Sequence, residues 1–271
     1  MSKKPKRAKR KTGLSSQTAL VDKWLSQASN QVFKEDYVGA VDTCQRLLNY
    51  LPQKAQQRAE ALYYLATAQS MLQNFPQAYA AYTEAIAVTP DDAQLWYNRG
   101  LASRFTARTG QSVRDFERAI QLNKNPALTR QFAKELKFSQ SLAEKSRKMR
   151  GPNFTLDQLI EQEELFQSAL DLMESGKWEE AEKAFQRVIE MGDCLPQPWG
   201  NLGSCLIMQE RYDDAEAALK RALEIDPRYA IAKQNLALLP ETRRTGPPKM
   251  VGMLDPFKAT KVKQEITFVV E

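Results

Sequence analysis

The sequence contains no histidine, so the most common general base and the most common metal ligand of proteins are both missing. It also lacks Cys-x2-Cys pairs, glycine-rich phosphate loops and Gly-x-Ser-x-Gly elbows. These absences argue against zinc centres, nucleotide-binding loops and serine-hydrolase sites. We therefore expect no catalytic residue, no metal site and no cofactor, and we interpret the chain as a protein without enzymatic activity.

Long hydrophobic runs are also absent, and no apolar segment follows the basic N-terminus. We therefore expect no transmembrane helix, no signal peptide and no membrane partner. The three cysteines, Cys44, Cys194 and Cys205, are odd in number and scattered, which argues against a disulfide framework. Cysteines without a pairing pattern suit a reducing compartment, so we expect a cytoplasmic protein.

What the sequence does contain is a repeated pattern of two helix-forming segments. In Pro196–Tyr229, apolar and small residues recur at helical spacing, and a proline ends the second segment. The residues that carry this pattern are Trp199, Leu202, Gly203, Ala215, Leu219, Ala222 and Pro227. Small residues at facing positions let two helices approach closely, and large side chains fill the space between pairs. No single pair can bury its apolar face alone, so the pattern predicts stacked helix pairs.

The pattern recurs in register along the chain. Its further copies are Val21–Lys54, Ala59–Asp92, Ala93–Pro126 and Gln162–Leu195. In the copy Ala93–Pro126, Arg99 replaces the usual leucine and Ser112 the usual alanine. The residue types and their spacing resemble the tetratricopeptide repeat (TPR), a helix–turn–helix unit of about 34 residues. The resemblance implies an all-α fold, a right-handed TPR-type solenoid arranged in one or two blocks.

The segments between and beyond the repeats complete the expected domain organisation. We expect a basic disordered tail over residues 1–20, a block of three repeats over 21–126 and a block of two repeats over 162–229. Residues 127–161 have the length of a repeat but a degraded pattern, so they form either a cap or a linking hinge. Residues 230–245 are expected to form a capping helix. Residues 246–271 form a tail with the β-prone run Ile266–Val270.

A concave groove is the expected binding surface, because the first helix of each pair lines the groove in TPR-like stacks. In the N-terminal block the expected groove residues are Leu25, Phe33, Tyr63, Tyr64, Met71, Tyr97, Asn98, Leu101 and Phe105. In the C-terminal block they are Phe166, Leu170, Met173, Asn201 and Met208. Exposed apolar stripes mark interaction sites, and the two asparagines are suited to grip a peptide backbone. The alternative is that these side chains pack against a capping helix or the C-terminal tail.

The carboxylate clamp of TPR co-chaperones, which hold the C-terminus of heat-shock proteins, is not expected here. That clamp needs charged residues on the helices before and after a central asparagine. Asn98 fits the central position, but Tyr63 stands at a clamp position before it and Leu128 at one after it.

Positive charge is concentrated near the N-terminus of a chain with 39 Lys and Arg against 33 Asp and Glu. The basic residues of this run are Lys3, Lys4, Lys6, Arg7, Lys9, Arg10 and Lys11. One interpretation is a solvated tail without a partner, and another is an electrostatic anchor for RNA, ribosomes or DNA. The run also fits a short nuclear import pattern, so a nuclear location stays open beside the cytoplasmic one.

We interpret the chain as a non-enzymatic adaptor or scaffold that binds a peptide or helix of a partner protein in the concave TPR groove. The alternative is a factor associated with RNA, ribosomes or DNA, in which the repeats only present the basic tail. A third interpretation is an oligomerisation scaffold that uses the run Ile266–Val270. The sequence leaves the partner's identity, the pathway and the oligomeric state open.

Overall fold

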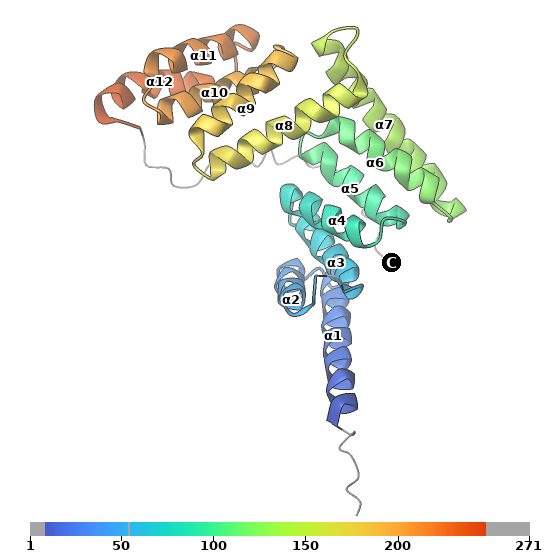
Figure 1. Ribbon diagram of the computed structural model, residues 1–271. Coiled ribbons are helices and arrows are strands. Elements are labelled where there is room, and N and C mark those ends of the chain that lie inside the picture. The colour runs from blue at the N-terminus through green and yellow to red at the C-terminus, as the bar shows by residue number, and fades with distance from the viewer. Residues whose placement is uncertain (1–8, 54, 248–271) are drawn as a thin grey trace, which may run out of the picture. The chain divides into compact units, whose positions relative to one another are not determined.

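The computed structural model describes residues 9–53 and 55–247, with side chains from Gln17 onward. Within these residues all regular structure is α-helical (Figure 1). The helices are α1 (Lys9–Phe33), α2 (Tyr37–Tyr50), α3 (Gln57–Met71), α4 (Phe75–Val88), α5 (Ala93–Phe105), α6 (Thr109–Leu122), α7 (Pro126–Arg150), α8 (Leu156–Glu174), α9 (Trp178–Met191), α10 (Pro196–Met208), α11 (Tyr212–Ile225) and α12 (Ala230–Thr245). The expected all-α fold of serial helix pairs is confirmed.

Two compact units make up the described chain. Unit 1 contains residues 9–106 and 112–136, and unit 2 contains residues 107–111 and 137–247. In unit 1, α1 packs on α2, α3 packs on α4, and α2 and α4 also contact the helices that follow them. In unit 2, α8 packs on α9 and α10 on α11, while α12 packs on both α11 and α10. The second helices α2, α4, α9 and α11 therefore pack between their own partner and the helix that follows.

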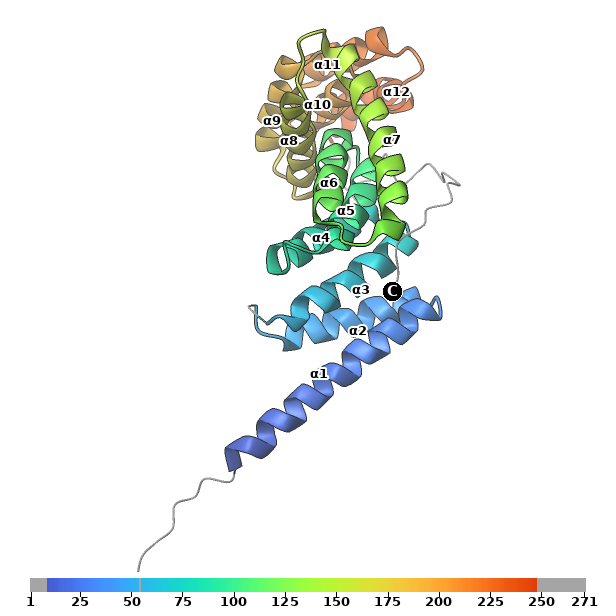
Figure 2. The same ribbon diagram turned by 90° about the vertical axis from the view of Figure 1, so that its right-hand side faces the viewer.

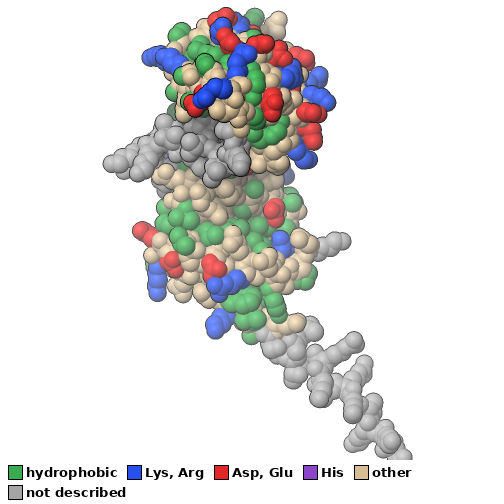
Figure 3. All heavy atoms as spheres, turned by 90° about the vertical axis from the view of Figure 1, so that its left-hand side faces the viewer, with side chains coloured by type: hydrophobic (Ala, Val, Ile, Leu, Met, Phe, Trp, Pro, Cys, Tyr) green, Lys and Arg blue, Asp and Glu red, His purple; other side chains and the backbone are tan. Residues whose placement is uncertain are grey.

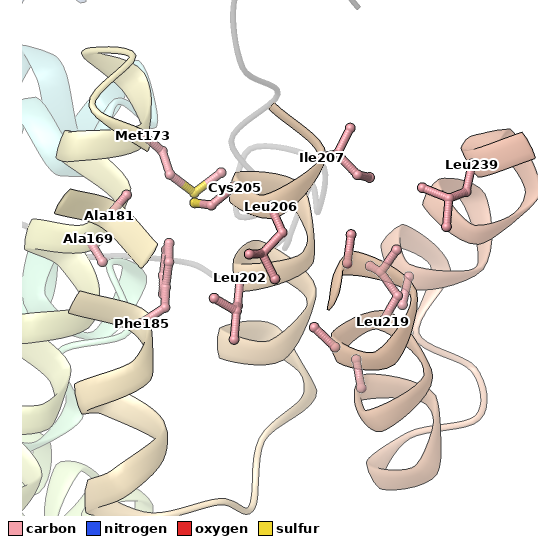
Figure 4. Close-up of a cluster of buried hydrophobic side chains, with 14 residues drawn as sticks. Ala169, Met173, Ala181, Phe185, Leu202, Cys205, Leu206, Ile207, Leu219 and Leu239 are labelled. Carbon is pink, nitrogen blue, oxygen red and sulfur yellow. The ribbon is translucent and has the colours of Figure 1, made fainter. Parts of the chain in front are cut away.

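The core of unit 2 shows how small residues set this packing. Side chains of α8 to α12 point toward one another around Phe185, Leu202 and Leu219 (Figure 4). A Cβ atom added at Gly203 would lie 2.7 Å from Leu219 Cγ, closer than real Cβ contacts allow. Glycine therefore stands at this repeat position because α10 and α11 touch there.

The turns inside the helix pairs share one backbone conformation. A residue with positive φ follows the first helix at the same position in each pair, namely Glu35 (62°), Gln73 (62°), Ala107 (55°), Gly176 (71°) and Glu210 (61°). In the turn after α8, Lys177 N–H donates to the carbonyl of Leu172 at 2.9 Å, as in a Schellman cap. The repeats thus preserve a left-handed turn even where the residue is not glycine.

The first helix begins earlier than expected. The sequence predicts a basic disordered tail over residues 1–20, but α1 starts at Lys9 and its first turns extend past α2 in both ribbon views (Figures 1 and 2). A helix that packing has already nucleated near Val21 propagates at low cost, because each added residue brings one hydrogen bond. Residues 9–20 contain no proline that would stop it. The β-prone run Ile266–Val270 lies outside the described residues.

Candidate functional site

Three residues expected in the groove of unit 1 lie in its core. The ring of Tyr97 stacks on Phe132 of α7 with centroids 4.4 Å apart, and its hydroxyl accepts a hydrogen bond from Gln131 Nε2 at 2.8 Å. Leu101 packs in the same cluster as Phe132, and Asn98 is 0% exposed. The expectation of an open groove is therefore corrected at these positions, because α7 supplies the apolar side that buries Tyr97.

Other expected groove residues differ widely in exposure. Leu25, Met173 and Asn201 are buried, so they are also core residues rather than groove residues. Phe33 and Met71 are exposed, at the C-terminal ends of α1 and α3. The two asparagines therefore do not present their amides to a peptide backbone in this conformation.

Three further groove candidates are half-buried by neighbours within their own units. Phe105 stacks on Phe75, with ring centroids 4.3 Å apart and an interplanar angle of 17°. Leu170 packs against the core of unit 2, and Met208 lies half-buried at the end of α10. These side chains support the packing of the helix pairs.

Tyr63 and Tyr64 line a cavity of about 360 Å³ between α3 and α5, here called the α3–α5 cavity. The cavity is lined by Gln56, Ala59, Glu60, Tyr63, Tyr64, Thr89, Asp92, Gln94 and Leu95. The two tyrosine rings meet edge to face, with centroids 5.5 Å apart. Two first helices of adjacent repeats thus bring aromatic and polar side chains together in one concavity.

Carboxylates give the α3–α5 cavity its polarity. Tyr64 Oη donates to Glu60 Oε1 at 3.3 Å, and burial together with the charge of Glu60 raises the pKa of Tyr64. Asp92 is the N-cap of α5 and accepts the N–H of Gln94 at 2.8 Å. The lining residues include no lysine or arginine. A partner with an apolar surface and N–H or cationic groups would suit this cavity.

One face of unit 1 has fewer charged side chains than the same face of unit 2. On the face shown in Figure 3, charged side chains are dense over unit 2, whereas hydrophobic and uncharged side chains prevail over unit 1. Low charge combined with aromatic residues is typical of the central parts of protein–protein interfaces.

A second cavity, of about 180 Å³, lies within unit 2 and is here called the α8–α10 cavity. It is lined by Ala107, Thr109, Ser146, Arg150, Gln162, Glu163, Phe166, Val188, Leu195, Gln197 and Pro198. Of these residues, only Phe166 was expected in the groove. Arg150 donates to Gln162 Oε1 and, at 2.7 Å, to the carbonyl of Ser146, so its guanidinium is held by neighbouring side chains and backbone.

Glu163 binds the first turn of α6 at the edge of this cavity. Its carboxylate accepts the N–H of Thr109 at 3.0 Å and the N–H of Gly110 at 2.8 Å, and it also accepts the Thr109 hydroxyl. Burial raises the pKa of Glu163 to about 7, although these donors and the charge of Arg150 oppose the shift. The sequence analysis did not predict this role of Glu163. The feature that could have indicated it is the recurrence of glutamate at the matching position of another repeat, Glu60.

Several expectations concern membranes, metals and the basic run. No helix among the described residues is long and apolar enough to span a membrane. In the same part of the chain, histidine, cysteine and carboxylate side chains form no group of three or more that would hold a metal ion. Of the N-terminal basic run, residues 1–8 lie outside the described residues, and for residues 9–11 only the backbone is described.

Comparison with known proteins connects the repeats to one family. A family model described as tetratricopeptide repeat matches residues 63–124 and 166–230. The chain is 31% identical over 83 residues to the peroxisomal targeting signal receptor of Yarrowia lipolytica (strain CLIB 122 / E 150), a match covering 30% of the chain and 14% of the receptor.

Two solved structures are similar at low identity. The TPR domain of P58(IPK) has a TM-score of 0.44 at 13% identity, covering 83% of this chain and 65% of that one. YrrB, described as a TPR protein with an unusual peptide-binding site, has a TM-score of 0.36 at 18% identity, covering 79% of this chain and 91% of that one. The chain thus spans less than two thirds of both the receptor and the P58(IPK) domain.

Proposed function

Because this chain belongs to the tetratricopeptide repeat family, we propose that it is a protein-interaction adaptor that holds a peptide or helix of a partner in the α3–α5 cavity. The observation that carries the proposal is the cavity itself, where Tyr63 and Tyr64 meet the carboxylates of Glu60 and Asp92. Tyrosine is enriched among the residues that dominate interface energies. A concavity with few convergent polar groups is the usual form of a binding site.

The burial of Tyr97 and Leu101 narrows the proposed surface. Since these two side chains pack in one cluster with Phe132 of α7, we limit the proposed surface in unit 1 to the α3–α5 cavity. The matched relative is named as a receptor for a targeting signal, which supports a binding role for this chain. The partner itself is unidentified.

A capture experiment with charge-reversal variants tests this function. Glu60 is an exposed lining residue, so Glu60→Arg alters the cavity with little risk to folding. Glu190→Arg, on an exposed side of α9, is the matched control. We expect Glu60→Arg to reduce the partners captured by the full chain about tenfold or more, and Glu190→Arg to leave them unchanged. If both variants melt normally and retain the same partners, the cavity is not the binding site.

A further inference from the structure

The two cavities are lined from equivalent positions of the repeat. Trp96 and Trp199 occupy the same position in their repeats. Several residues that line the α3–α5 cavity are separated by this same number of positions from residues that line the α8–α10 cavity. The equivalent pairs are Ala59 and Gln162, Glu60 and Glu163, Tyr63 and Phe166, Asp92 and Leu195, Gln94 and Gln197, and Leu95 and Pro198. A glutamate, an aromatic ring and a glutamine therefore recur at the same places between successive first helices.

In the α8–α10 cavity, the recurring glutamate contacts the first turn of a helix, α6. Ala107 and Thr109 line this cavity, and Glu163 accepts two N–H groups from the first turn of α6. The first N–H groups of any helix lack partners inside the helix, so an external acceptor stabilises them. When it is ionised, the carboxylate also favours the positive end of the helix dipole. The bound turn fits closely, because a Cβ atom added at Gly110 would lie 2.8 Å from Ile160 Cγ1.

The α3–α5 cavity has the same glutamate with more room around it. Its volume is about 360 Å³ against about 180 Å³ for the α8–α10 cavity. Glu60 is exposed and accepts a hydrogen bond from Tyr64. Because a carboxylate has about four acceptor positions, this bond uses only part of its capacity to accept N–H groups. At the position of Ile160, which crowds Gly110 in unit 2, unit 1 has Gln57, which is exposed.

We propose that the α3–α5 cavity receives the N-terminal turn of a helix from a partner protein, with Glu60 accepting its free N–H groups as Glu163 accepts those of α6. This inference rests on the proposed adaptor function and names the feature that is recognised. The partner's first turn carries small residues and a hydroxyl, like Thr109 and Gly110. Asp92 adds a second negative charge that favours the positive end of the helix dipole.

The test uses a helical probe based on residues 107–122 of this chain. The peptide is acetylated, labelled at its C-terminus and held helical by a lactam bridge that replaces Arg114 and Arg118, since an isolated helix of this length is marginal. Two versions are compared by fluorescence anisotropy with the full-length protein. Gly110→Ala keeps the N–H that the glutamate accepts, whereas Gly110→Pro removes that N–H and is tolerated in the first helical turn.

We expect the alanine peptide to bind the wild-type protein about tenfold more tightly than the proline peptide. Glu60→Gln should weaken binding of the alanine peptide about tenfold and erase the difference between the peptides. Glu190→Gln, the matched control, should change neither affinity. The proposal is overturned if the two peptides bind the wild-type protein equally well, or if neither shows saturable binding up to about 1 mM. It is also overturned if Glu60→Gln leaves the affinity for the alanine peptide unchanged.

An extended basic peptide is the competing occupant, since carboxylates line the cavity. A peptide with the sequence of residues 3–11 is therefore titrated under the same conditions. If it binds the same cavity more tightly than the helical probe, the proposal of a helix terminus is refuted. If Glu60→Arg loses its captured partners while the helical probe fails to bind, the proposal fails and the adaptor function stands.

Discussion

Arg99 and Asp115 form a buried ion pair between α5 and α6 of unit 1. The guanidinium donates from Nε at 3.0 Å and from Nη2 at 2.6 Å to the two carboxylate oxygens, and Asp115 is 0% exposed. At the equivalent positions of the repeat Pro196–Tyr229, the chain has Leu202 and Ala218. The pair therefore replaces an ordinary apolar contact by two charges that depend on each other.

Removing one partner should be far more damaging than removing both. Arg99→Leu leaves the carboxylate of Asp115 buried without its cation, which costs about 3–5 kcal/mol of unfolding free energy. Asp115→Ala should cost less, because the guanidinium keeps its position over the ring of Trp96 at 4.8 Å. The double variant restores the apolar pair of the other repeat. It should lie within about 1 kcal/mol of wild type or be more stable.

Urea unfolding of the four proteins, followed by circular dichroism and tryptophan fluorescence, measures this coupling. The expected pattern is a midpoint for the double variant that is at or above the wild-type midpoint, with both single variants below it. If the losses of the two single variants simply add in the double variant, the ion pair is not the reason for their cost.

Three further predictions concern a turn, a buried acid and the thiols. Gly176 has φ of 71° with open space around its Cβ position, so Gly176→Ala should lower the unfolding free energy by about 1 kcal/mol through backbone strain alone. Glu210 has φ of 61°, so Glu210→Gly should raise the unfolding free energy by roughly 0.5 kcal/mol in the same urea assay. Glu163 has a pKa of about 7 in the folded protein and near 4.5 in the unfolded chain. The folded protein therefore holds this proton more tightly, and the temperature of the unfolding midpoint should fall as the pH rises between these two values. Glu163→Gln should reduce this dependence of the midpoint on pH. Burial raises the pKa of Cys205 to about 12, so the half-buried Cys194 should react first with a disulfide reagent, and equal labelling rates of these two thiols would contradict the packing.

The helix pairs were predictable because their determinants are local. Apolar residues at helical spacing, a small residue such as Gly203 at each close approach, and a proline such as Pro227 after the second helix are all visible in the sequence. The start of α8 is local too, since Thr155 forms a capping box with Gln158 three residues later. Because these features recur along the sequence, they predict the order of the helices.

The candidate site was less predictable, because it depends on contacts between distant segments. Tyr97 was expected to be accessible, but its burial depends on α7, whose apolar pattern is degraded and did not indicate which side chains it would cover. The bond from Gly110 to Glu163 joins residues that are 53 positions apart, and helical periodicity carries no information about such a pair. Arg99 was noticed as a departure from the pattern, but its partner Asp115 was not.

Contact between a partner protein and the α3–α5 cavity is the central claim, and site-specific photo-crosslinking tests it most directly. The photoreactive residue p-benzoylphenylalanine replaces Gln94, which lines the cavity, or Met149, which is exposed on α7 outside it. After irradiation of the full chain in a native lysate, we predict a covalent adduct with another protein from position 94 and no such adduct from position 149. The absence of an adduct from position 94, or the same adduct from both positions, would contradict the account.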